Sequence, residues 1–381
     1  MKMLWALPRW LAHVIYLLLV APFLLLGTMC ALALADLWRK FLPPIDLEPD
    51  QAPAHEAISV VIPTCPHRKP KLEALLEGIA STATDRDAFE VIVVVDGHDE
   101  APLEVASTLP PTIRFQGLTK GHAGPAAARN FAIEHACGDW LVFFDDDLRV
   151  DEDTIPGHLR LIRNDPNAVQ AHLGRADWPH DLLDSPWRQL LAQTSMLFFW
   201  DHMTSGKHYG FRHFWTLNLS VRRDCVLQVG GFREQFPWAM HEDIELGWRL
   251  QESLGLQVHV DRSIQSFHDH ALDPHDYLLR EHKSGKSAGA ARTINPAFHD
   301  LVWPWIDDPV HQLTTLQELF LTPARDVLRL FHTWAEPSDH RLTPHELHAA
   351  YLAHMPLKRM VFLHGYLDRP FEALWDQLHA D

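Results

Sequence analysis

This chain of 381 residues contains few cysteines, and fewer basic than acidic residues. Its four cysteines are Cys30, Cys65, Cys137 and Cys225. No two of them form a Cys-x-x-Cys pair, which argues against a disulfide framework and against a cysteine zinc site. The 33 basic and 50 acidic residues give a net charge of −17, so no nucleic-acid partner is expected, because such surfaces need clustered positive charge. The composition is 47% hydrophobic and 22% charged, which excludes a mainly disordered chain.

The N-terminal segment has no charged residue between Arg9 and Asp36. Residues 14–35 form a nearly continuous apolar run, which as a helix is roughly 33 Å long and could cross a bilayer. We therefore predict a membrane anchor in residues 1–40. A cleaved signal peptide and an interfacial or hairpin helix bent at Pro22 remain alternatives, and the charges on both sides of the run do not determine its orientation.

Residues 41–56 combine prolines with acidic residues, which predicts a stiff, solvated linker. After this linker, short apolar runs rich in β-branched residues alternate with segments of helical periodicity. Strands are predicted at 57–63, 89–95, 113–116 and 140–144, and helices at 69–80, 103–108 and 125–136. The alternation predicts an α/β fold with a mostly parallel sheet and helices on both faces.

Polar residues follow three of these strands, at Thr64, Asp96 and Asp145. Ligands of open α/β sheets bind beyond the carboxyl ends of the strands, so these positions predict a binding site. The third belongs to the sequence FFDDD at 143–147, whose carboxylates repel one another unless a cation neutralises them. Oxygen ligands of this kind favour magnesium or manganese. The alternative interpretation is an acidic turn before a helix that begins at Thr154.

A second acidic motif is His241-Glu242-Asp243, which precedes an amphipathic stretch at 244–254. Acidic residues at a helix N-terminus are favoured by the helix dipole, so a simple cap would explain them. The functional interpretation is a general base held at the start of the helix.

The third motif is His268-Asp269-His270, after two short strand-like runs at 256–260 and 263–267. Alternate residues of a strand share one face, so the two imidazoles could form a zinc pair. The chain has 27 histidines, however, and chance matches are therefore expected.

Several motifs occur in an order that is typical of one family. They are SVVIPT at 59–64, VIVVVDG at 91–97, GPAAARN at 124–130, FFDDD at 143–147, NLSVRR at 218–223, GGF at 230–232 and HEDIELGWRL at 241–250. With this ordered set, the chain resembles the inverting glycosyltransferases of family 2, which have the GT-A fold. The resemblance covers roughly residues 57–290, which it marks as the glycosyltransferase domain.

The resemblance implies a role for several residues on the donor side. Asp96 resembles the aspartate that binds the nucleobase or ribose, and Thr64 and Arg68 belong to the loop that lines the nucleotide pocket. Arg129 matches an arginine near the donor, where a guanidinium suits diphosphate recognition. Asp145 is similar to the first aspartate of the DxD motif, which contacts the ribose and the metal.

The resemblance also implies a divalent metal, Mn or Mg, and a catalytic base. Asp147 matches the metal-binding end of the DxD motif together with Asp145, and His268 resembles a histidine that completes the metal site in some members. Asp243 matches the proposed base, with Glu242 beside it. Inversion then follows from attack of an acceptor hydroxyl on the face opposite the leaving diphosphate.

Two departures from the family pattern leave the nucleobase open. The first loop has Cys-Pro-His before Arg68, where many relatives carry an aromatic residue and an asparagine, and the second strand ends in one aspartate instead of two. The QxxRW motif of processive synthases is absent after Asp243, and only one long apolar run exists. A channel-forming synthase is therefore not expected.

The resemblance leads us to expect a membrane-anchored, metal-dependent glycosyltransferase that uses a nucleotide-diphosphate sugar, UDP-linked in our interpretation. Its acceptor would be a hydroxyl of a glycan or a lipid-linked compound. We expect the catalytic domain in the cytoplasm, where bacteria keep nucleotide sugars; a type II Golgi placement fits the sequence equally well in a eukaryote. Alternatives are a non-catalytic nucleotide-sugar-binding assembly protein and a sugar nucleotidyltransferase.

Residues 291–381 lie outside the resemblance, and we predict that they form a helical C-terminal extension, the tail of the chain. Amphipathic helical patterns occur at 313–331 and 345–363, and the tail histidines, including His354, are expected at the surface. Trp215 and Trp238 are equally consistent with stacking on a sugar and with the core. The role of the extension and the oligomeric state stay open.

Overall fold

The computed structural model describes residues 58–82, 89–97, 109–110, 113–164, 169–198 and 200–380. The predicted anchor at 1–40, the linker at 41–56 and the helix at 103–108 lie outside these residues. Among the helices in the described ranges, none is both long and apolar enough to span a membrane.

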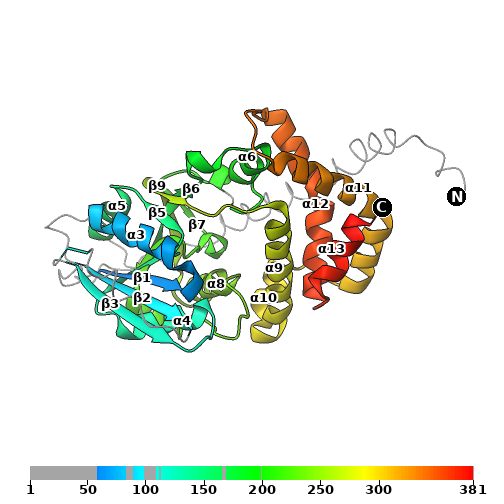
Figure 1. Cartoon of the computed structure of the whole chain (residues 1–381). Helices are drawn as coiled ribbons and strands as arrows, with labels where there is room; N and C mark the ends of the chain where they lie inside the picture. Colours follow the sequence, from blue (N-terminus) through cyan, green and yellow to red (C-terminus); the bar gives the residue numbers. More distant parts are fainter. Residues whose placement is uncertain are drawn as a thin grey trace, which may run out of the picture. The chain divides into compact units, whose positions relative to one another are not determined.

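The first four strands of the sheet run parallel, in the spatial order β3-β2-β1-β4. They are β1 (Ile58–Thr64), β2 (Glu90–Asp96), β3 (Arg114–Lys120) and β4 (Trp140–Phe144), and all four were predicted. Strands β2 and β4 are buried along their whole length, because apolar side chains line both of their faces. Helices α3 (Lys69–Thr82) and α4 (Pro125–His135) cover opposite faces of the sheet (Figure 1).

The second half of the sheet differs from the prediction, because the pairs β4–β8, β8–β6, β9–β5 and β9–β7 are antiparallel. The prediction of a mostly parallel sheet is therefore wrong. The sheet is mixed, and in this half only the pair β6–β9 is parallel. These strands are β5 (Leu148–Val150), β6 (Gln170–Asp177), β7 (Lys207–Tyr209), β8 (Asn218–Arg222) and β9 (Gln257–His268). The two short strands predicted at 256–260 and 263–267 merge into β9, whose pairing with β6 shifts register between Gly174 and Arg175.

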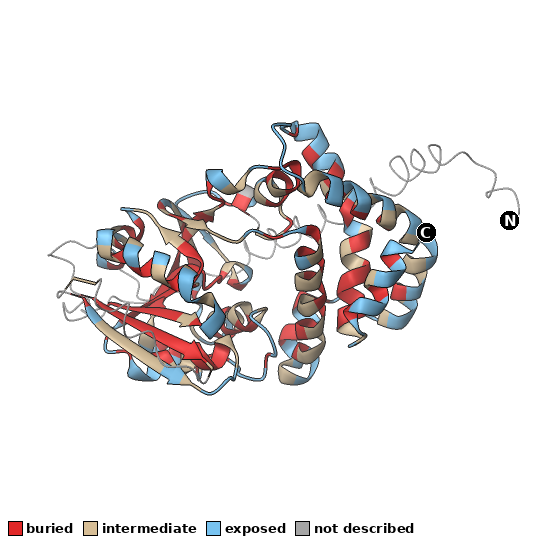
Figure 2. Cartoon of the chain, viewed as in Figure 1, coloured by how far each residue is buried: buried red, intermediate tan, exposed pale blue. Residues whose placement is uncertain are grey.

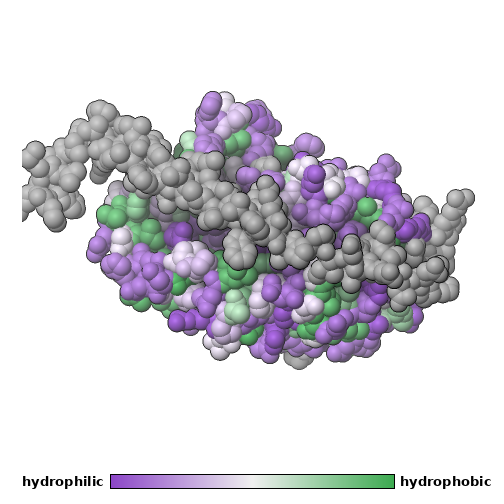
Figure 3. Space-filling view, turned by 180° about the vertical axis from the view of Figure 1, so that it is seen from behind, coloured by the Kyte–Doolittle hydropathy of each residue, from purple (hydrophilic) through white to green (hydrophobic). Residues whose placement is uncertain are grey.

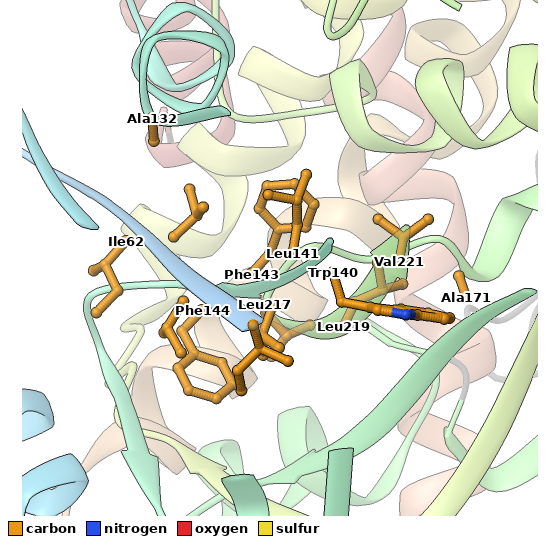
Figure 4. Packing of buried hydrophobic residues seen from close by; sticks show 14 of the residues in the cluster. Ile62, Ala132, Trp140, Leu141, Phe143, Phe144, Ala171, Leu217, Leu219 and Val221 are labelled. Atoms are coloured by element: carbon orange, nitrogen blue, oxygen red, sulfur yellow. The ribbon is translucent and has the colours of Figure 1, made fainter. Parts of the chain in front are cut away.

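Strand β4 lies in the middle of the main core. The side chains of its last two residues, Phe143 and Phe144, point to opposite faces of the sheet (Figure 4). On one face the Phe143 ring meets Phe232 edge to face, with 5.6 Å between ring centroids. On the other, Phe144 lies 6.3 Å from His158 of helix α5 (Thr154–Asn164). The carboxyl end of β4 is thus fixed on both sides just before its three aspartates.

Shorter elements connect the strands. They are the 3-10 helices η3 (Pro66–Arg68), η5 (His180–Leu182), η6 (Trp200–His202) and η7 (Phe211–His213), and the α-helices α6 (Pro186–Gln193), α7 (Arg223–Gln228) and α8 (Glu242–Leu254). Helix α8 begins at the second acidic motif. Its N-cap residue, His241, has φ 72°, a left-handed conformation that is unusual for a residue other than glycine.

The C-terminal part is helical and packs beside the sheet domain (Figure 1). Its helices are α9 (Pro274–Ile294), α10 (Pro296–Val302), α11 (Pro309–Ala335), α12 (Pro344–Tyr366) and α13 (Phe371–His379). The helical patterns at 313–331 and 345–363 are confirmed within α11 and α12, while α9 runs through the predicted domain boundary at 290. The surface position expected for His354 is wrong, because its side chain is only 1% exposed between neighbouring helices.

Helix α12 is buried around most of its second half, whereas α11 keeps one exposed side (Figure 2). The backbones of α9 and α12 approach closely at two glycines. A Cβ on Gly285 would overlap the carbonyl oxygen of Phe362, and a Cβ on Gly365 would overlap that of His282. Outside the grey residues, the face in Figure 3 mixes hydrophilic and hydrophobic residues, as protein surfaces commonly do.

Candidate active site

The loops after β1 and β4 are joined through the middle aspartate of the acidic motif. The Thr64 hydroxyl donates a hydrogen bond to Asp146 at 2.7 Å. Arg68 donates from Nε to both carboxylate oxygens of Asp146, at 2.7 and 2.9 Å, and its guanidinium lies 2.6 Å from Asp147. The structure thus brings the predicted residues Thr64 and Arg68 to the acidic motif. Asp146 was not predicted as a site residue, although it carries these contacts.

The last aspartate of the motif meets two histidines. Asp147 Oδ1 lies 3.3 Å from His268 Nε2, and Asp147 Oδ2 lies 2.8 Å from His270 Nδ1. The two imidazole rings are stacked, with 5.0 Å between centroids. The sequence assigned a function to His268 alone, and only the spacing of the motif indicated His270. β9 ends at His268, so His270 lies beyond the strand. The two rings therefore do not come together as alternate residues on one face of a strand.

Asp147, His268 and His270 could together hold a divalent metal. One carboxylate and two imidazoles suit manganese or another transition metal better than magnesium, which prefers oxygen ligands alone. Burial opposes ionisation of Asp147, yet the two histidines hold its pKa well below the usual range, so the carboxylate is charged. The Nδ1 atom of His268 is buried and, in the described part of the chain, has no hydrogen-bond partner. The residues therefore fit a metal site.

Asp145, which the sequence also assigned to the metal, is not one of these three residues, although its charge helps to raise the pKa of His268. It accepts a hydrogen bond from Arg129 at 2.9 Å, and the same buried guanidinium donates to Glu242 at 2.8 Å. Arg129 comes from α4 and Glu242 from the start of α8, so this ion-pair network connects the end of β4 with two helices. Arg129 thus pairs with two carboxylates in the structure, and its contact with a diphosphate stays a prediction.

Asp243 and Glu242 are adjacent but face different surroundings. Glu242 is 2% exposed against Arg129, whereas Asp243 is half-buried and faces a cavity. Burial raises the pKa of Asp243 to about 6, although the nearby charge of Arg129 opposes the shift. Burial and the neighbouring Asp243 also raise the pKa of Glu242. A carboxylate whose pKa lies near neutrality is a better proton acceptor than an ordinary aspartate.

Asp96 lies at the end of β2 and contacts the loop before α4. Its carboxylate accepts hydrogen bonds from the backbone N–H groups of Ala123 at 2.7 Å and Gly124 at 2.9 Å, and His122 Nδ1 lies 3.1 Å away. Gly124 has φ 88°, which this turn requires and which glycine adopts without strain. The structure therefore uses Asp96 to fix the loop at the N-terminus of α4.

The cavity beside Asp243 has a volume of about 430 Å³. Trp215 is 7% exposed and lies in its wall, next to Phe198, with 5.2 Å between ring centroids. Trp238 is not among the lining residues; it is 38% exposed, and Lys283 lies 5.1 Å from its ring centroid. The C-terminal extension, residues 291–381, which we call the tail, also lines the cavity, through Trp303, Trp305 and Phe362.

Residues 59–217 match the family model described as Glycosyl transferase family 2. Validoxylamine A glucosyltransferase from Streptomyces hygroscopicus subsp. jinggangensis is 27% identical over 261 residues, which are 60% of this chain and 61% of the relative. Pre-mycofactocin glycosyltransferase from Mycobacterium tuberculosis is 25% identical over 264 residues, covering 65% of this chain and 50% of the relative. The chain thus spans about three fifths or less of the length of these relatives.

A solved structure with a similar fold is a mannosyltransferase from Pyrobaculum calidifontis in complex with GDP-Man and Mn²⁺. It is 19% identical, has a TM-score of 0.51, and the match covers 91% of this chain and 94% of that chain. This likeness supports the fold, including the predicted α/β core. Glu242, Asp243, His268 and His270 lie beyond the segment that matches the family model, and they join it only in three dimensions.

Proposed function

Because this chain contains a family 2 glycosyltransferase domain, we propose that the protein transfers a sugar from a nucleotide-diphosphate donor to a hydroxyl group of an acceptor. The observation that carries the proposal is the position of Asp243. Its carboxylate faces a cavity that can hold an acceptor. Arg129 connects this part of the site to the end of β4, because it pairs with both Asp145 and Glu242, the neighbour of Asp243. Named glycosyltransferases among the relatives agree with this activity.

On the donor side, the residues that would hold a divalent metal are Asp147, His268 and His270. When bound, such an ion neutralises negative charge on the leaving nucleoside diphosphate. Arg68 holds Asp147 and Asp146 in place from the loop after β1, so the ligand carboxylate is oriented before the donor arrives. The Thr64 hydroxyl donates a further hydrogen bond to Asp146.

On the acceptor side, Asp243 takes the proton of the attacking hydroxyl. The hydroxyl oxygen forms the new bond to the anomeric carbon as the bond to the diphosphate oxygen breaks, and that oxygen keeps the electron pair. Attack from the opposite face inverts the configuration. Glu242 has a different task, because its ion pair with Arg129 fixes the start of α8 and with it the direction of Asp243.

The remaining parts of the proposal concern substrates and location. A UDP-linked sugar and a glycan or lipid-linked acceptor fit a chain whose residues 14–35 could anchor it to a membrane. The catalytic domain would then face the cytoplasm, where bacteria keep nucleotide sugars. The mannosyltransferase of similar fold holds GDP-Man, so guanine donors belong in any test.

The test is a thermal-shift screen of the full chain against UDP- and GDP-sugars, with Mn²⁺, with Mg²⁺ and with chelator. A donor present at 100 times its Kd stabilises the folded state by about 2.7 kcal/mol, which is readily measured. We expect one donor to raise Tm only with metal and to release free nucleoside diphosphate. Release of pyrophosphate would identify a nucleotidyltransferase instead. Donor binding without turnover would indicate an assembly protein, and no shift with any donor would contradict the proposal.

A further inference from the structure

The cavity beside Asp243 is positively charged, although the chain has a net charge of −17. Its lining includes the cations Arg212, Arg280, Lys358 and Arg359. The carboxylates of the lining are only those of Asp243 and Glu281. An acidic protein that gathers four cations around one cavity has a local field opposite to its overall charge, and such a field attracts anions.

Two of these cations have no carboxylate partner among the residues that the structure describes. The guanidinium of Arg359 stacks on Trp305, 3.5 Å from the ring centroid, and burial lowers its pKa. Arg212 donates to the backbone carbonyls of Leu301 at 3.1 Å and Val302 at 3.3 Å. Arg359 is half-buried, and partial burial of a guanidinium without a counter-charge is unfavourable, so this position is suited to a negative ligand. Arg212 is exposed and adds an accessible positive charge to the same cavity.

The other two cations share one carboxylate. Glu281 is 4% exposed and lies 3.4 Å from Lys358 Nζ and 3.8 Å from Arg280. Lys358 also donates to the carbonyl of Met196 at 3.0 Å, which holds its ammonium at the cavity wall. Glu281 therefore orients these side chains while it neutralises only part of their charge.

Aromatic residues form much of the remaining wall. Trp215 comes from the sheet domain, and Trp303, Trp305 and Phe362 come from the tail. Their flat faces suit the apolar face of a sugar ring or a hydrocarbon chain. The cavity thus combines an aromatic wall, a group of cations and the proposed base.

We propose that the acceptor is an anionic compound, whose phosphate or carboxylate group binds Arg359, Lys358 and Arg212 while its hydroxyl meets Asp243. This inference rests on the proposed function, because it names the acceptor class of the same site. It also gives the tail a task, since α12 supplies Lys358 and Arg359. The anionic group is not altered in the reaction; it positions the hydroxyl.

The donor side does not account for Arg212, Lys358 and Arg359, whereas Arg280 lies close enough to His268 for its charge to act on that imidazole. The arginines of the donor side, Arg68 and Arg129, are each paired with two carboxylates at the end of β4 or the start of α8. Lys358 and Arg359 lie on a different element, helix α12. A diphosphate held near Asp147 therefore leaves Arg212, Lys358 and Arg359 for a second anion.

The test uses three probes with the same octyl chain on a pyranose ring of the gluco configuration, which differ at C6: octyl glucoside, octyl glucuronide and octyl glucoside 6-phosphate. Calorimetric titration of the full chain below the micelle concentrations should give an affinity at least about tenfold higher for one anionic probe than for the neutral one, as expected for hydrogen bonds to charged groups. The better anionic probe identifies phosphate or carboxylate. Equal affinities, or no binding of any probe, would overturn the inference.

The matched variants are Arg359→Gln and Lys358→Gln in the cavity, and Arg329→Gln at an exposed position of α11. The cavity variants should lose the anionic preference, and the α11 variant should keep it. Two cavity variants are used so that misfolding of one leaves the other as a test. A preference that survives in both, or a loss of donor affinity in place of acceptor affinity, would overturn the inference. The metal-dependent donor shift is measured in parallel, so its absence contradicts the proposed function independently.

Discussion

Adjacent carboxylates in this molecule have different partners, and their partners decide what each can do. Asp145 pairs with Arg129, Asp146 with Arg68 and Thr64, and Asp147 with Arg68 and two histidines. Of these three aspartates, only Asp147 is placed to share a metal with imidazoles. Three like charges are stable side by side because cations or hydrogen-bond donors compensate each of them.

Replacing Asp243 by Asn should abolish the proposed proton transfer and retain donor binding. Loss of a general base commonly lowers the rate by about 10²- to 10⁴-fold. In the unmodified protein, the rate should rise as the pH increases through about 6, because the base must be ionised to accept a proton. Initial rates and the donor-induced thermal shift measure the two effects. Asp326→Asn, in an exposed pair on α11, is the control; full turnover of the Asp243 variant would contradict its role.

His270 should contribute to metal binding as His268 does. Replacing either by Ala should lower the affinity for Mn²⁺ by at least about 10-fold, since even residues behind the ligands commonly have effects of this size. Titration calorimetry with Mn²⁺ alone measures the affinity, and His345→Ala, at an exposed position of α12, is the control. If only the His268 variant lost affinity, His270 would merely hold Asp147 in position.

The sequence indicated most of the residues that meet at the site, but not how they pair. Thr64, Arg68, Asp147 and His268 were predicted, and the structure brings them together. Asp146 was not predicted, and His270 was considered only as part of a possible zinc pair, because which of several neighbouring side chains turns inward depends on the backbone of the loop. Arg129 was expected at a diphosphate, and its pairing with Glu242 joins segments more than a hundred residues apart.

At the scale of elements, the packing of α9 against α12 brings the tail to the site. Their backbones touch at Gly285 and Gly365, where any larger side chain would overlap a carbonyl oxygen. Helix α9 carries Arg280 and Ser284 of the cavity wall, and α12 carries Lys358 and Arg359. The close approach of the two helices therefore sets the width of the cavity.

Replacing Gly285 by Ala should destabilise the protein and disturb this wall. An added methyl group in a tightly packed interface commonly costs about 1–3 kcal/mol, and here it meets backbone, which cannot turn away. Denaturant unfolding measures the loss. Gly78→Ala in α3 is the comparison variant, because its methyl group would meet the Cγ2 methyl group of Val150 at 2.9 Å but no backbone atom nearer than 4.0 Å, so it should cost less. Equal stability of the Gly285 variant and the unmodified chain would contradict the close packing.

The elements themselves were predictable where local sequence decides them. β1, β2 and β4 are apolar runs that read as buried strands, and α4 begins at a proline, which is favoured in the first helical turn. The antiparallel half of the sheet was not predictable, because strand direction depends on the path of the chain between strands. β9 was expected as two strands because polar residues interrupt its apolar pattern near Asp261.

At the scale of the whole molecule, several of the 27 histidines are buried and neutral. Burial lowers the pKa of His158 to about 4, and its ring nitrogens contact Ser220 at 3.0 Å and Asn218 at 2.8 Å. Burial lowers the pKa of His354 to about 3 and that of His364 to about 4. Such histidines must be charged when the chain unfolds in acid, so they make folding sensitive to pH.

Because of His158, the free energy of unfolding should decrease as the pH falls. Its pKa is lower in the folded protein than in the unfolded chain, so the unfolded chain binds more protons between about pH 6.5 and 4, and the free energy of unfolding falls in that window. The shift corresponds to about 3 kcal/mol for this group. The raised pKa of Asp243 acts in the opposite direction, so the comparison needs a variant.

The variant is His158→Gln, which keeps hydrogen-bonding groups but does not titrate. Denaturant unfolding at several pH values should show a weaker loss of stability on acidification than in the unmodified protein. His345→Gln, at an exposed site, should behave like the unmodified chain. An identical pH dependence in the His158 variant and the unmodified protein would show that His158 does not carry this effect.

The cavity is the feature that sequence reasoning could not reach. Its lining comes from six separate stretches of the chain, which include Met196, Trp215, Asp243, Arg280, Trp303 and Arg359. No local pattern joins them, because they meet only after the tail has packed on the sheet domain. The net charge of −17 likewise gave no indication that one cavity would be positive.

The connection between β9 and α9 bears on the entropy of binding. Only Asp269–Asp273 separate His268 from the helix that carries Arg280. Asp269 is fixed by its backbone bond to Asp147 at 2.8 Å and by ion pairs with Lys71 at 2.8 Å and Arg149 at 2.9 Å. The conformational freedom of this connection is therefore lost during folding, before any substrate arrives. Ligands meet a preorganised site, and less of their binding free energy is consumed in ordering the protein.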